Sequence, residues 1–122
     1  MVKLEPALMT GTWYATDKEA AVVVRLELSE NDDGVVVRAF GDSDGRPYDW
    51  GEVRATLYGS STTATQAMAF SALYDFGAMT ALLAAYAKQG ILVLDTFTVF
   101  KEPTVKDDSG RADYFSREFF HR

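Results

Sequence analysis

Two charged residues that interrupt apolar runs are the strongest candidates for chemistry in this chain. Arg38 lies in the run 35–40, and Asp95 lies in the run 91–99. If either side chain faces the protein interior, the cost of burying a charge requires a partner or a bound ligand. An inward Arg38 would await an anionic ligand, and an inward Asp95 would have a raised pKa or pair with Arg38. If the alternate positions face inward, both side chains are simply exposed, and the sequence leaves both arrangements open.

Metal and nucleophile chemistry has little support in the sequence. The chain has no cysteine, and its one histidine is the penultimate residue, His121. Zinc binding, haem ligation by histidine and a Ser-His triad are therefore not expected. The acidic segment 42–45 resembles the start of a calcium loop, but Val53 occupies the position that should supply the closing carboxylate. The sequence predicts no metal and no cofactor, and it identifies no catalytic residue.

Composition limits the classes of partner. The chain has 122 residues, 48% of them hydrophobic, which is enough for one domain spanning 1–122. A net charge of -6 disfavours nucleic acid and anionic membranes, because both bind basic surfaces. No apolar run reaches the length of a signal peptide or a membrane span. Together with the absence of cysteine, this predicts a cytoplasmic protein.

Alternating apolar and polar residues predict a chain of short strands. The clearest hairpin joins 20–31 to 35–40 through the turn-forming segment 31–34. Turn-forming residues make 41–47 and 101–111 expected loops. Further strands are expected at 48–58, 64–74, 91–100 and 113–122. Short strands joined by turns favour a barrel or sandwich in which neighbours in sequence are neighbours in the sheet.

The segment 79–89 has two interpretations. Its alanine and leucine content favours a helix that ends before Gly90. The tripeptide Lys88-Gln89-Gly90 also suits a tight turn between two antiparallel strands, and strand propensity depends strongly on context. The sequence leaves strand and helix open here.

The tetrapeptide Gly11-Thr12-Trp13-Tyr14 resembles the first-strand motif of the calycin superfamily, which contains lipocalins, fatty-acid-binding proteins and avidins. This resemblance implies an all-β fold, an antiparallel up-and-down β-barrel of about eight strands. It also implies that Trp13 is buried at the closed end of the barrel beneath a basic residue of a late strand. Arg117 is the expected cover, through stacking and cation–π attraction. The mouth of the barrel is the expected functional site.

The leading functional hypothesis is that a small apolar or amphipathic molecule, such as a metabolite or a lipid-like compound, binds inside the barrel. One alternative is a cofactor-independent isomerase or cyclase that shapes a flexible substrate there. The other is an interaction module with a filled barrel whose exposed sheet pairs in a homodimer. Alternating positions on six expected strands supply the candidate ligand-binding residues, namely Tyr14, Arg38, Trp50, Phe70, Tyr74, Tyr86 and Phe97.

Overall fold

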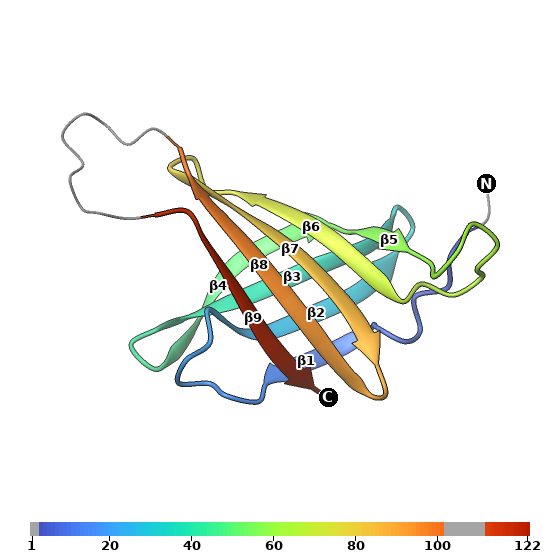
Figure 1. Ribbon diagram of the computed structural model, residues 1–122, viewed down its shortest axis with the longest axis horizontal. Helices are drawn as coiled ribbons and strands as arrows, with labels where there is room; N and C mark the ends of the chain where they lie inside the picture. Colours follow the sequence, from blue (N-terminus) through green and yellow to red (C-terminus); the bar gives the residue numbers. More distant parts are fainter. Residues whose placement is uncertain (1–2, 102–111) are drawn as a thin grey trace.

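The chain folds into a single antiparallel sheet of nine strands with no helix among the described residues, 3–101 and 112–122 of the computed structural model (Figure 1). The strands are β1 (Gly11–Ala15), β2 (Val23–Asn31), β3 (Gly34–Ser43), β4 (Arg46–Arg54), β5 (Thr56–Tyr58), β6 (Ala69–Asp75), β7 (Met79–Lys88), β8 (Ile91–Phe100) and β9 (Tyr114–His121). Their order in the sheet is β4-β3-β2-β1-β9-β8-β7-β6-β5. The prediction of an all-β antiparallel fold is confirmed.

The first hairpin forms as predicted, with β2 and β3 joined by a tight turn at Asp32 and Asp33. The ambiguous segment 79–89 is a strand, because β7 pairs with β6 on one side and β8 on the other. Its inward side chains, including Ala81, Leu83 and Ala85, are small or aliphatic and fully enclosed. Gln89 and Gly90 have φ values of 53° and 86°, as a tight hairpin turn requires. Tertiary pairing therefore outweighs the helix propensity of this segment.

Several expected boundaries are wrong. The expected loop 41–47 is mostly strand, since β3 continues to Ser43 and β4 begins at Arg46 around a turn at Asp44 and Gly45. The expected strand 48–58 is interrupted at Ala55, whose amide bonds to the carbonyl of Val35. The expected strand 64–74 begins only at Ala69. Apart from Lys101, the expected loop 101–111 lies outside the described residues.

The sheet curls so that its two halves cross. Figure 1 shows β6 to β9 passing in front of β1 to β4. Backbone pairing of the described residues ends at β4 on one side and at β5 on the other, so the sheet is not closed into a barrel by its ladders. The expected closed barrel of about eight strands is therefore not confirmed. The described residues also include no helix with the length and apolarity of a membrane span.

The space between the two halves is filled by side chains. The largest fully buried ones include Trp13, Tyr74, Phe70, Phe120 and Met9, from three strands and the segment before β1. Such dense packing leaves the interior occupied by the protein's own side chains.

Trp13 is buried, as the motif predicted, and its indole Nε1 donates a hydrogen bond to the carbonyl of Met9 at 2.8 Å. The expected cover by Arg117 is wrong, because the guanidinium of Arg122 lies 4.4 Å from the indole centroid. Phe120 faces inward on β9, so Arg117, three residues earlier, faces outward.

Candidate ligand-binding site

The seven residues predicted to line one interior site do not converge. Phe70 and Tyr74 are buried in the core, and Trp50 is half-buried. The other four have side chains exposed on the outside of the sheet, and they are Tyr14, Arg38, Tyr86 and Phe97. The register of each strand decides this division, since a shift of one residue moves a side chain to the opposite face.

Both charged candidates are paired on the outer surface. Val35 and Val37 face inward, so Arg38 faces outward and forms an ion pair with Asp49, with Nε 3.0 Å from Oδ2. The Arg38 hydrogen bond lowers the pKa of Asp49 to about 2. Asp95 pairs with Arg117 rather than with Arg38, through contacts of 2.7 and 3.0 Å. Neither Arg38 nor Asp95 is therefore a buried, unpaired charge that could bind a ligand inside the sheet.

A hollow of about 510 Å³ lies at the end of the sheet where the barrel mouth was expected. We call it the end hollow. It is formed by the loop before β2, the end of β3, and the first residues of β4, β7 and β9. Its lining combines apolar, aromatic and polar groups, with slightly more polar than apolar surface, and consists of Ala21, Val22, Gly41, Asp42, Ser43, Tyr48, Trp50, Met79 and Tyr114.

Trp50 is held in the end hollow by close contacts on two sides. A Cβ atom at Gly41 would lie 2.7 Å from the indole Nε1, so the glycine is needed for this approach. The indole makes edge contacts with Tyr74 and Phe76 at centroid distances of 5.4 and 5.3 Å, and those two rings stack on each other at 5.6 Å. These geometries are favourable for aromatic pairs and restrict the indole to one position.

Tyr74, which contacts Trp50, connects β6 to the opposite half of the sheet. Its hydroxyl accepts a hydrogen bond from the amide of Ala39 at 3.0 Å and donates one to the carbonyl of Gly51 at 2.7 Å. The amide of Ala39 is available because a register shift interrupts the β3–β4 ladder between Arg38 and Phe40. Burial raises the pKa of Tyr74 to about 12, so the phenol stays protonated and serves a structural role.

Glu118 positions one wall of the end hollow. Its carboxylate accepts hydrogen bonds from the backbone amides of Val22 and Val23, the second at 3.3 Å. Burial raises the pKa of Glu118 above its ordinary value, although the two amide donors act in the opposite direction. The carboxylate thus fixes the turn into β2 that carries Ala21 and Val22 into the lining.

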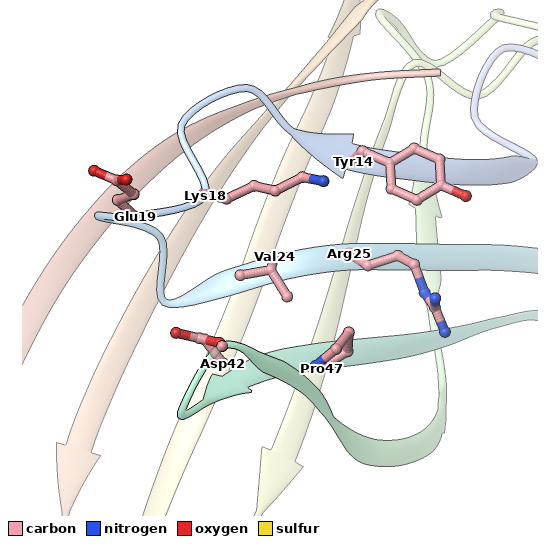
Figure 2. Close-up of a pocket in the computed structure, with 8 residues that line it drawn as sticks. Tyr14, Lys18, Glu19, Val24, Arg25, Asp42 and Pro47 are labelled. Atoms are coloured by element: carbon pink, nitrogen blue, oxygen red, sulfur yellow. The ribbon is translucent and has the colours of Figure 1, made fainter.

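A second hollow of about 430 Å³, the outer hollow, lies outside the sheet next to β1 and β2 (Figure 2). Figure 2 shows the side chain of Lys18 directed toward Tyr14, and its Nζ lies 5.9 Å from the ring centroid. The guanidinium of Arg25 is already engaged, 3.9 Å above the ring of Phe40 and 3.3 Å from a carboxylate oxygen of Glu27. The remaining lining residues are Glu19, Val24, Asp42, Gly45 and Pro47.

No group of three or more His, Cys, Asp or Glu side chains within 3–101 and 112–122 is arranged to hold a metal ion. In the end hollow the lining offers one carboxylate, Asp42, and one serine hydroxyl, Ser43. An amphipathic molecule, with an apolar ring or chain and several polar groups, matches this lining.

The sequence predicted Trp50 and its neighbour Tyr74 as site residues, but it did not predict the other residues that line the end hollow. Ala21 and Val22 lie just before β2, which begins at Val23 and not at 20 as expected, and Met79 begins a segment for which the sequence left strand and helix open. Gly41 carried a usable signal, since a glycine at the end of an apolar strand often marks a close approach. The turn-forming residues that follow it predict a loop over 41–47 instead.

Comparisons with known proteins provide no relative for this chain. No family model matches it, and searches among curated proteins and among solved structures found no match either. The fold and the two hollows are therefore the basis for functional inference.

Proposed function

We propose that this protein binds a small apolar or amphipathic molecule in the end hollow. The observation that carries the proposal is the hollow of about 510 Å³ built against the fixed, half-buried indole of Trp50. Small-molecule sites are concave, mostly apolar, and contain a few well-placed polar groups. Trp50 and Tyr114 offer ring faces, Met79 offers an adaptable apolar contact, and Asp42 and Ser43 offer polar contacts.

The proposed site is at the end of the sheet rather than deep within it. Trp13, Phe70 and Leu83 are fully enclosed in the interior, and a ligand there would have to displace such side chains. Displacing core side chains would cost several kcal/mol, whereas the end hollow is already open. The site is thus the mouth of the fold, consistent with the location that the calycin resemblance implies.

The proposal includes a barrel-like arrangement of the two sheet halves. The hydroxyl of Tyr74 on β6 bonds to β3 and β4, so a side chain supplies contacts between strands that are not paired neighbours in the sheet. A calycin-like barrel closed in this way, and a cytoplasmic location, remain predictions from the sequence.

We favour binding over catalysis for this site. The carboxylate in the described lining, Asp42, is exposed, and efficient proton transfer usually requires a group shielded from water. An isomerase or cyclase acting by shape alone would use the same hollow, so the first experiment measures binding.

The test is a titration with the apolar anionic dye 1-anilinonaphthalene-8-sulfonate, followed by tryptophan quenching. We expect one dye per chain, with quenching that is lost in Trp50→Phe because Trp13 is fully buried and does not line the hollow. Met79→Lys should weaken binding about tenfold by placing a charge in the apolar lining.

Two matched controls locate the dye. Lys18→Ala alters the outer hollow, and Phe97→Lys alters the exposed apolar surface, so neither should change the affinity for the dye by more than about twofold. Loss of binding in either control, with Met79→Lys unaffected, would contradict the proposed site.

A further inference from the structure

The outer face of β6 to β9 carries a large exposed apolar surface. These four strands lie side by side in the sheet (Figure 1). Their cross-strand pairing aligns Leu73, Leu82, Phe97 and Phe115 in one continuous row. Each of these side chains is between 40% and 56% exposed. We call the outward side of the four strands the outer face.

A second apolar row runs parallel to the first, four residues away along each strand. Between the two rows lies a central polar row that contains Asp95 and Arg117. The second row contains Tyr86 and Phe119, 40% and 48% exposed, which flank Val93 across the β7, β8 and β9 ladders. Ile91 and Val99 extend the surface along β8. At the accessible areas usual for such side chains, these exposed fractions amount to roughly 700 Å² of apolar surface. Taken together, the two rows on either side of the polar row approach the area that each partner buries in a standard interface.

The central row contains two opposite charges that are paired with each other. Asp95 and Arg117 are paired across β8 and β9 by two hydrogen bonds of 2.7 and 3.0 Å. A partner that covers this row therefore leaves neither charge unpaired, which is the costly case for a buried ion pair. The chain as a whole has a net charge of -6, and the paired charges of the central row add nothing to like-charge repulsion between two copies at this face.

The two halves of the outer face differ in shape at the level of Phe119 and Arg117. The β8–β9 half presents the large side chains Phe97, Phe115, Arg117 and Phe119. The β6–β7 half borders a hollow of about 320 Å³, in which the small residues Ala69, Ser71 and Ala84 lie between Tyr58, Tyr86 and Asp95. A two-fold axis that runs along the strands between β7 and β8 would place the large half of each copy against the hollow half of the other.

We propose that the outer face of β6 to β9 is the interface of a homodimer, with a two-fold axis along the strands between β7 and β8. In this arrangement Phe119 of one copy faces the small residues Ala69 and Ser71 of the other, and the relationship is repeated by symmetry. The interface uses none of the residues that line the end hollow, so it is independent of the proposed ligand site.

Sedimentation equilibrium tests the proposal on the full chain. We expect a dimer at about 100 µM protein, and a dissociation constant raised at least about tenfold by Phe97→Lys, because the new charge would be buried among apolar side chains. Ala84→Arg should weaken the dimer to a similar extent by filling the hollow without removing an apolar contact. Tyr48→Lys, which makes the same charge change at a side chain 61% exposed on β4, should leave the dimer unchanged.

Circular dichroism checks that each variant is folded, and only folded variants are compared. A wild-type chain that stays monomeric at about 100 µM overturns the proposal and assigns the outer face to a different partner. A dimer weakened by Tyr48→Lys as much as by Phe97→Lys places the interface elsewhere. A dimer that survives Ala84→Arg but not Phe97→Lys overturns the proposed two-fold axis.

Discussion

The hydroxyl of Tyr74 accepts a hydrogen bond from the backbone amide of Ala39 at 3.0 Å, although the two residues lie on strands at different places in the sheet. The same hydroxyl donates to the carbonyl of Gly51 at 2.7 Å. One buried side chain thus satisfies backbone groups that the interrupted β3–β4 ladder leaves unpaired, and it holds β6 against β3 and β4.

Tyr74→Phe should lower the free energy of unfolding by about 1–3 kcal/mol, because the amide of Ala39 and the carbonyl of Gly51 would lose their partner while buried. The ring contacts with Trp50 and Phe76 would remain. Urea denaturation measures the loss. Tyr86→Phe, at an exposed position, is the matched control and should have almost no effect. Equal effects of the two substitutions would show that the bridge contributes nothing.

Trp13→Ala should lower the free energy of unfolding by about 3–5 kcal/mol, since the indole is fully buried and its loss leaves a cavity. A loss below about 1 kcal/mol would be inconsistent with this burial. Arg122→Ala should destabilise the protein slightly more than Arg117→Ala, because the Arg122 guanidinium lies over the indole and Arg117 pairs only at the surface. Thermal unfolding of the two arginine variants gives the comparison.

Glu118 gives the stability a defined pH dependence. Its folded-state pKa is raised above the ordinary value of 4.5 by burial, so the folded protein holds this proton more tightly than the unfolded chain does. Its contribution to stability is therefore complete below pH 4.5 and declines as the pH rises through the raised pKa. Glu118→Gln removes this titration. The wild-type protein should lose stability relative to the variant as the pH rises above 4.5, in chemical denaturation at a series of pH values. A difference that stays constant with pH, or one that changes in the opposite direction, would contradict the raised pKa.

Gly41→Ala should displace the indole of Trp50, because the added Cβ would lie 2.7 Å from Nε1. We expect a shift of the Trp50 emission and weaker dye binding at the end hollow. Fluorescence of this substitution in a Trp13→Phe background isolates the signal of Trp50, since the chain has two tryptophans. An unchanged emission spectrum would mean that the close approach of Gly41 does not hold the indole.

Local patterns predicted the strands better than they predicted which side chains face inward. The turn residues Asn31 to Gly34 fixed the first hairpin. In β3, however, both faces are apolar, with Val35 and Val37 on one side and Val36 and Phe40 on the other. The alternation therefore could not decide that Arg38 faces outward.

The same limit applies to the candidate site. On β9, aromatic residues occupy both faces, so the sequence could not show that Arg117 faces outward and that Arg122 covers Trp13. Of the seven predicted ligand-binding residues, Trp50 lines the end hollow, and Tyr74 contacts Trp50 from the core. The rest of the lining comes from strand ends, whose positions depend on pairing between distant segments.

Backbone amide NMR during titration with 1-anilinonaphthalene-8-sulfonate tests the central claim, that the end hollow binds a small apolar molecule, most directly. The proposal predicts saturable chemical-shift changes at Val22, Ser43 and Met79 and at the indole N–H of Trp50, with little change at Tyr14 or Ala84. Changes confined to the outer hollow around Tyr14, or to the outer face around Ala84, would contradict it, as would the absence of any saturable change.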